Sequence, residues 1–97
     1  MPYITPGQRD ALDPSLTDLI RAFDQARARG DIPAGAVDGS VNYMITRLLH
    51  AAYAVKTDPH YQEFNAAVGV LESVKLELYR RYVAPYENGK MADNGDV

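Results

Sequence analysis

The chain contains no cysteine and no long apolar run. Without cysteine, neither disulfide bonds nor thiolate metal sites can form. No apolar run approaches the roughly 18 residues that a membrane-spanning helix requires. The first residues lack the basic and then apolar order of a secretory signal peptide. These absences favour a reducing, aqueous compartment, and we expect the protein in the cytoplasm.

Basic residues are also fewer than acidic residues. The formal net charge is -3 and the isoelectric point is about 5.2. Nonspecific binding of nucleic acid requires a basic surface, so nucleic acid is not an expected partner. The length of 97 residues predicts a single domain over residues 1–97, because two hydrophobic cores would each be too small to be stable.

Known catalytic motifs are missing as well. The chain has no glycine-rich phosphate loop, no Gly-x-Ser-x-Gly elbow and no His-Glu-x-x-His motif. The two histidines, His50 and His60, fall on different predicted helices, which does not match a metal-ligand spacing on one helix face. We therefore expect no catalytic residue, no metal and no cofactor. An active site assembled between copies, with Glu72 or Glu77 as its acid or base, remains an alternative.

Proline and glycine divide the chain into predicted helices. Thr5, Pro6 and Gln8 match a helix start with a capping box, and Asp13 before Pro14 predicts that this short helix ends and a second one begins. Gly30 is expected to terminate the second helix. The main helices are predicted over residues 13–29, 40–56 and 59–84, with a loop over 30–40. The helix 40–56 is expected to start at Asp38 or Ser40, and the helix 59–84 is expected to start at Asp58–Pro59.

Apolar residues recur at helical spacing in all three main segments. Pro85 is predicted to stop the last helix. Two Asn-Gly pairs favour turns with positive φ in the segment 85–97, which we interpret as coil, with a small hairpin as the alternative. The predicted fold is all-α: a small bundle of three long helices plus a short N-terminal helix, with an irregular C-terminal tail. The expected core residues include Leu16, Leu19, Ile20, Phe23, Val41, Ile45, Leu48, Leu49, Phe64, Ala67, Val68, Leu71, Val74, Leu78 and Tyr82.

The last predicted helix carries a second, partly apolar face roughly opposite its core stripe. Gly69, Glu72, Leu76 and Val83 lie on it at spacings of three and four. A helix that is apolar on two sides lies either at the centre of a bundle or against another chain. We therefore predict a homo-oligomer with these residues at the interface. The alternative is that the short first helix or the tail covers this face.

Two clusters of polar and aromatic residues are not explained by core packing. The first lies on the predicted helix 40–56, and the second lies at the end of the predicted helix 59–84. Guanidinium groups pair with anions and aromatic rings stack on bases, so both clusters are candidates for binding an anionic ligand. The alternative is an ordinary solvated surface with ion pairs along each helix. The candidate ligand-binding residues are Asn42, Tyr43, Thr46 and Arg47 in the first cluster and Tyr79, Arg80 and Arg81 in the second.

Several short motifs are spread over nearly the whole chain: Met1-Pro2-Tyr3-Ile4, Asn42-Tyr43-x-Ile45-Thr46-x-Leu48, Gly69-Val70-Leu71-Glu72-x-x-Lys75-Leu76-Glu77-x-Tyr79-Arg80-Arg81, Pro85-Tyr86-Glu87 and Asn94-Gly95-Asp96-Val97. In these motifs the chain resembles a family of short uncharacterised proteins of bacteriophages and bacteria. The resemblance implies a viral or mobile-element origin and no established activity. The resemblance also marks polar residues that core packing does not require, and these overlap both unexplained clusters.

Together these observations predict a non-enzymatic, homo-oligomeric binding protein of phage type in the host cytoplasm. It would bind a small anionic ligand such as a nucleotide signal. Two alternatives remain open: a protein-interaction module that inhibits a host defence complex, and a small enzyme whose active site forms between copies. The expected partners are a second copy of the chain, an anionic small molecule or a host protein, and no membrane.

Overall fold

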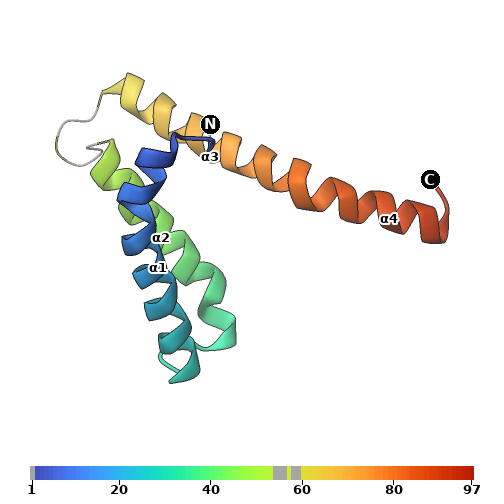
Figure 1. Ribbon diagram of the computed structural model, residues 1–97, viewed down its shortest axis with the longest axis horizontal. Helices are drawn as coiled ribbons and strands as arrows, with labels where there is room; N and C mark the ends of the chain where they lie inside the picture. Colours follow the sequence, from blue (N-terminus) through green and yellow to red (C-terminus); the bar gives the residue numbers. More distant parts are fainter. Residues whose placement is uncertain (1, 54–56, 58–59) are drawn as a thin grey trace.

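The computed structural model describes residues 2–53, 57 and 60–97, and every regular element in that part of the chain is helical. This confirms the predicted all-α class for the described residues. None of the described helices is both long and apolar enough to cross a bilayer. In chain order the elements are α1 (Pro6–Ala28), the 3-10 turn η1 (Ala34–Ala36), α2 (Val37–Ala52), α3 (Tyr61–Leu78), the π-helical turn η2 (Tyr79–Val83) and α4 (Ala84–Asn94) (Figure 1).

Helix α1 begins where the sequence predicts and then runs much further. The backbone N–H of Gln8 donates to Thr5 Oγ1 at 3.2 Å, and the N–H of Thr5 donates to Gln8 Oε1 at 2.9 Å, so the capping box is confirmed. The predicted break at Asp13–Pro14 is wrong, because α1 continues through Pro14 to Ala28. Proline leaves the Asp10 carbonyl without its helical donor, but this turn is exposed and water can hydrate the group. One helix of 23 residues thus replaces the short helix and the helix 13–29.

Gly30 ends α1 with a left-handed turn, as predicted. Its φ is +83°, its N–H donates to the Arg27 carbonyl at 3.1 Å, and the N–H of Asp31 donates to the Ala26 carbonyl at 3.0 Å. These two bonds form a Schellman motif, which satisfies carbonyls that the helix end would otherwise leave open. The turn reverses the chain toward η1 and α2.

Helix α2 begins earlier than predicted. It starts at Val37, so Asp38 and Ser40 lie within its first turn and do not cap it. The preceding turn η1 leads directly into α2, and the Ser40 hydroxyl donates to the Ala36 carbonyl at 2.8 Å. The described part of α2 ends at Ala52. The predicted end at residue 56 and the predicted start at Asp58–Pro59 lie outside the described residues, and α3 begins at Tyr61.

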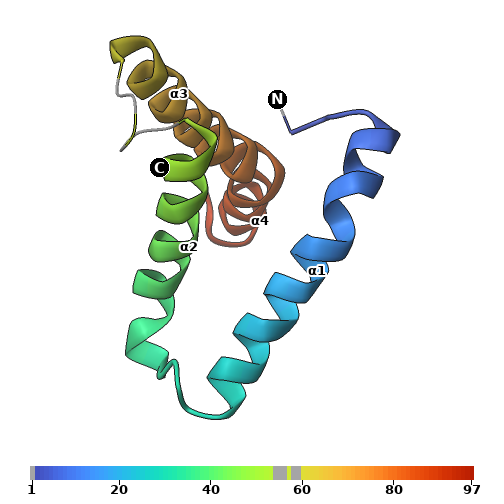
Figure 2. The same ribbon diagram turned by 90° about the vertical axis from the view of Figure 1, so that its left-hand side faces the viewer.

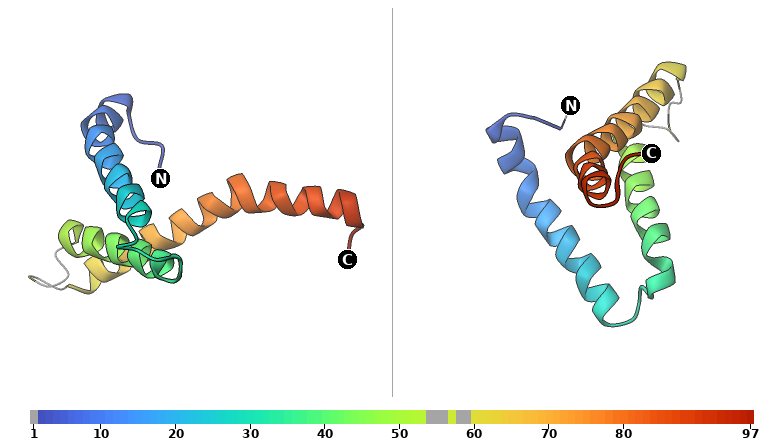
Figure 3. Two further views of the ribbon diagram at one scale, coloured as in Figure 1. Left: turned by 90° about the horizontal axis from the view of Figure 1, so that it is seen from below. Right: turned by 90° about the vertical axis from the view of Figure 1, so that its right-hand side faces the viewer.

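The helix does not stop at Pro85. Instead α3, η2 and α4 form one continuous, gently curved rod (Figure 3). In an α-helix the nitrogen of Pro85 would face the Arg81 carbonyl, where proline has no hydrogen to donate and its ring clashes. The π turn widens the helix just before this point, because its hydrogen bonds join residues five positions apart. The N–H of Ala84 donates to the Tyr79 carbonyl in this way. Pro85 then falls in the first turn of α4, where a missing N–H costs little.

The predicted irregular tail is therefore wrong for residues 85–94, which are helical, and the alternative hairpin is not formed there either. The pair Asn88-Gly89 lies inside α4. The predicted positive φ is found at the second pair, where Gly95 has a φ of +89° and terminates α4. Its N–H donates to the Met91 carbonyl at 2.9 Å.

The helices of one chain do not close into the predicted bundle. Helices α1 and α2 diverge from their connecting loop as a V (Figure 2), and α4 extends away from both of them (Figure 1). Among the described residues, Ala67 is the only one that is buried. The predicted core residues Ile20 and Tyr82 are 60% and 65% exposed. Their helical spacing was identified correctly, but the faces that they form are not covered within one chain.

Candidate functional site

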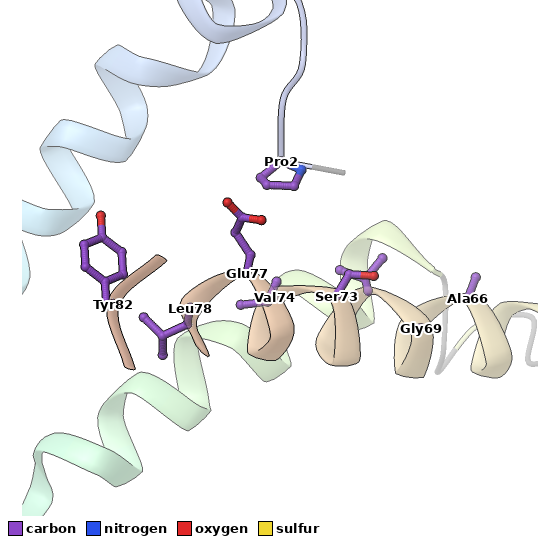
Figure 4. A pocket seen from close by; sticks show the side chains of 9 residues that line it. Pro2, Ala66, Gly69, Ser73, Val74, Glu77, Leu78 and Tyr82 are labelled. Atoms are coloured by element: carbon purple, nitrogen blue, oxygen red, sulfur yellow. The ribbon is translucent and has the colours of Figure 1, made fainter. Parts of the chain in front are cut away.

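An apolar hollow runs along the rod of α3 and η2. We call it the α3 groove. It has a volume of about 660 Å³ and is open to solvent. In Figure 4 its side chains follow one another along the rod, and Pro2 faces Glu77 from the N-terminal arm. The lining residues are Pro2, Ala66, Gly69, Val70, Ser73, Val74, Glu77, Leu78 and Tyr82.

The N-terminal arm is held at this groove by three side chains, which we call the arm cluster: Tyr3, Glu77 and Arg80. The hydroxyl of Tyr3 donates a hydrogen bond to Glu77 Oε1. Nη2 of Arg80 donates to the Tyr3 hydroxyl at 2.8 Å and to Glu77 Oε1 at 2.9 Å. The three groups therefore form a closed triangle of hydrogen bonds that joins the arm before α1 to the end of α3.

The arm cluster also sets the charge state of Glu77. The hydrogen bond from the Tyr3 hydroxyl lowers the pKa of this carboxyl, and the Arg80 and Arg81 guanidinium groups act in the same direction. The hydrogen bond to Glu77 and the charge of that carboxylate raise the pKa of Arg80. Nη1 of Arg81 lies 3.9 Å from Glu77 Oε1, beyond hydrogen-bond distance. Both members of the Glu77–Arg80 pair are therefore charged at neutral pH.

The predicted polar cluster of α2 is organised along its own helix. Nη1 of Arg47 donates to the Tyr43 hydroxyl at 2.8 Å, and its guanidinium carbon lies 5.7 Å from the centre of the Tyr43 ring. The hydroxyl of Thr46 donates to Asn42 Oδ1 at 3.1 Å. Both pairs are four residues apart, the spacing at which side chains meet on a helix. Arg47 makes no ion pair with a carboxylate among the described residues, so its charge is not neutralised there.

Part of this cluster lines a hollow between α1 and α2. The hollow has a volume of about 600 Å³. Its polar groups come from Tyr43, Arg47, His50 and Thr57. Leu19 of α1 and Met44 and Leu48 of α2 supply apolar surface. A volume of this size is typical of small-molecule sites, although such sites are usually more enclosed.

Within one chain, the structure does not bring the two predicted ligand-binding clusters together. Tyr43 and Arg47 line the hollow at α2, whereas Arg80 bonds to Tyr3 and Glu77 at η2. No hydrogen bond, ion pair or ring contact joins the two clusters among the described residues. Tyr79 precedes Arg80 on η2 and is exposed. The assignment of these residues to a ligand site stays a prediction, and a site containing both clusters would need more than one chain.

The four predicted interface residues are all accessible in the single chain. Leu76 is 57% exposed and Val83 is 37% exposed, so neither the arm nor α4 covers them. A Cβ atom at Gly69 would meet no atom within 4 Å. Glu72 forms an ion pair with Lys75 at 3.2 Å on the helix surface. Leu76 is therefore not shielded by the first helix or by the tail, as the alternative prediction would require.

The described residues contain no group of three or more histidine, aspartate or glutamate side chains that could hold a metal ion. Residues 1–97 match the family described as a domain of unknown function, DUF6899. The chain belongs to this family. No curated protein and no solved structure matches the DUF6899 chain.

Tyr3 was not among the site residues predicted from the sequence of this DUF6899 protein. Tyr3 contacts Glu77 across 74 positions, and no periodicity or spacing rule reports a contact of that range. The available signal was indirect: Tyr3 belongs to a motif on which the family resemblance was based. The sequence predicted Glu77 as an ion-pair partner of Arg80 and Arg81 and, in the enzyme alternative, as an acid or base. The ion pair is confirmed for Arg80 at 2.9 Å.

Proposed function

We propose that this protein functions as a homo-oligomeric, non-enzymatic helical binding protein whose hydrophobic core forms between copies. The observation that carries the proposal is the surface of the single chain. It exposes 8021 Å², whereas a compact monomer of 10.7 kDa would expose about 5,500 Å². The excess is about 2,500 Å² per chain, or about 5,000 Å² for a pair, which matches the interfaces of obligate oligomers.

The shape of the chain supports the same proposal. Its radius of gyration is 17.2 Å, compared with about 12.5 Å for a compact domain of this length. Large apolar side chains are exposed on α1, α2 and α3 alike, including Leu16, Leu48 and Val74. Isolated helices are marginally stable in water, so these helices need packing that one chain does not provide. A second copy supplies matching apolar faces and is always present at the same concentration.

Thermal unfolding at several protein concentrations tests this proposal. If folding and association are coupled, the melting temperature followed by far-ultraviolet circular dichroism rises with chain concentration. A fully helical chain with a melting temperature independent of concentration would contradict an obligate oligomer.

The hollow between α1 and α2 supports a second candidate function, capture of a small anionic ligand. Arg47 has no carboxylate partner among the described residues and lies beside the Tyr43 ring, so it can pair with a phosphate while the ring stacks on a base.

A thermal-shift screen with nucleotides and cyclic dinucleotides tests this function. A tight ligand at saturating concentration stabilises the wild type by several kcal/mol and loses that effect in Arg47→Ala. If no compound shifts the wild type, a host protein becomes the expected partner, and a pull-down from host lysate would identify it. We also propose a phage origin for the protein, on the basis of the sequence resemblance.

A further inference from the structure

The α3 groove is an extended apolar surface, and its chemistry restricts what can cover it. Its lining contains one charged residue, Glu77, and that carboxylate already accepts hydrogen bonds from Tyr3 and Arg80. The rest is aliphatic, aromatic or small, and Leu78 and Tyr82 are 56% and 65% exposed. The groove therefore suits an apolar helix face better than a charged peptide or a polar ligand.

We infer that the α3 groove is covered by the same groove of a second copy, with the two α3 helices antiparallel about a two-fold axis near Val74. This inference rests on the proposed homo-oligomeric function. The excess surface of each chain is large enough for an obligate dimer interface, and a two-fold axis lets one surface cover itself.

The order of side chains along the groove determines the direction of the pairing. Small residues, Ala66 and Gly69, line the half toward the start of α3, whereas Leu78 and Tyr82 line the half toward α4. Ala66 and Tyr82 lie at equal sequence distances on either side of Val74, and so do Val70 and Leu78. An antiparallel pair consequently places the large residues of one copy over the small residues of the other. A parallel pair would oppose Tyr82 to Tyr82 and leave empty space at Gly69.

Gly69 has a specific role in this arrangement. A helix-interior glycine costs about 1 kcal/mol relative to alanine, and nothing within its own chain requires it, because a Cβ atom there meets no atom within 4 Å. In the antiparallel pair Gly69 lies near Tyr82 of the second copy and leaves room for that ring.

Site-directed cross-linking tests the pairing directly, because the natural chain has no cysteine. Two variants, Ala66→Cys and Tyr82→Cys, are prepared separately, mixed and treated with a short bismaleimide. The antiparallel pair predicts a covalent dimer in the mixture and little in either variant alone. Val74→Cys, close to the axis, should cross-link to itself, whereas Val68→Cys, 64% exposed and outside the groove lining, should not. Circular dichroism checks that each variant keeps its helical content.

The possible results separate the inference from the proposed function. An oligomer that cross-links through Val68→Cys but not through Val74→Cys overturns the inference and leaves the homo-oligomer intact. Self-linking of both Ala66→Cys and Tyr82→Cys also overturns it, because that pattern belongs to parallel helices. A monomer under all conditions contradicts both the inference and the proposed function.

A bulky substitution at Gly69 provides an independent check. Gly69→Trp is expected to weaken association by about fivefold or more, since overpacking costs about 1–3 kcal/mol and about 1.4 kcal/mol corresponds to tenfold. Gly89→Trp is the matched control, because Gly89 also lies inside a helix with no atom within 4 Å of its added Cβ and is outside the groove. Equal affinity of the Gly69→Trp variant and the wild type would overturn the inference.

Discussion

The hydroxyl of Tyr3 donates a hydrogen bond to the carboxylate of Glu77, 74 positions further along the chain. This contact and the bond from Arg80 to the same hydroxyl tie the N-terminal arm to the long helix. The other side-chain hydrogen bonds described connect residues at most five positions apart. The arm cluster is therefore the main polar link between distant parts of the chain.

Replacing Tyr3 by phenylalanine should raise the pKa of Glu77 toward its ordinary value of 4.5, because the hydroxyl is the largest cause of the lowered pKa. The bond from Arg80 remains, so the pKa should stay somewhat below that value. Titration of the Glu77 carboxyl carbon by NMR measures the change. Tyr61→Phe, which alters an exposed ring with no bond to Glu77, should leave the titration unchanged. An identical Glu77 titration in Tyr3→Phe would show that the hydroxyl does not bind the carboxylate.

The arm should also be released by acid. Because the pKa of Glu77 is lowered in the folded chain, its contribution to stability is present above the ordinary value of 4.5 and is lost as the pH falls through the lowered value. The NMR signals of Tyr3 are expected to stay constant from about pH 8 down to the ordinary value of 4.5. They should become those of a mobile residue only as the pH falls through the lowered pKa of Glu77. In Glu77→Gln this transition should be absent. Release of the arm at neutral pH with Glu77 still charged would contradict this account.

Two glycine substitutions should change stability in opposite directions. Gly30→Ala forces a Cβ into a left-handed turn, with a φ of +83°, and should lower the free energy of unfolding by about 1–2 kcal/mol. Gly89→Ala lies inside α4 with open space around it and should raise that free energy by up to about 1 kcal/mol. Denaturant unfolding of both variants measures the difference. A stabilising Gly30→Ala would be inconsistent with the Schellman turn.

Replacing Pro85 by alanine should remove the reason for the π turn. The new N–H at position 85 can donate to the Arg81 carbonyl, so η2 is expected to tighten to an α-helix and to rotate α4 relative to α3. Hydrogen exchange should then show a protected amide at position 85, and secondary chemical shifts should show unbroken α-helix over 79–83. Pro14→Ala is the control, because it restores a helical donor in α1 and leaves η2 untouched.

Local signals in the sequence were the most reliable ones. The capping box at Thr5 and the turns at Gly30 and Gly95 are encoded by neighbouring residues, and the structure shows all three. Proline was less informative: Pro14 lies within an exposed helix, and Pro85 is accommodated by a π turn. A proline removes one bond, and the rest of a long helix can outweigh that loss.

Long-range structure was the harder part to predict. Apolar periodicity identified the faces of α1, α2 and α3, but it does not say whether the same chain or another copy covers them. Residues such as Ile20 and Tyr82 therefore appeared to be core residues and are exposed in one chain. The arm cluster was missed for a related reason, since Tyr3 and Glu77 are distant in sequence and each has an ordinary local environment.

Sedimentation equilibrium of the purified protein over a wide range of concentrations tests the central claim most directly. We expect a mass of twice the 10.7 kDa chain or a higher multiple, retained on dilution until the helices unfold together. A folded species of 10.7 kDa that persists at high concentration would contradict the account.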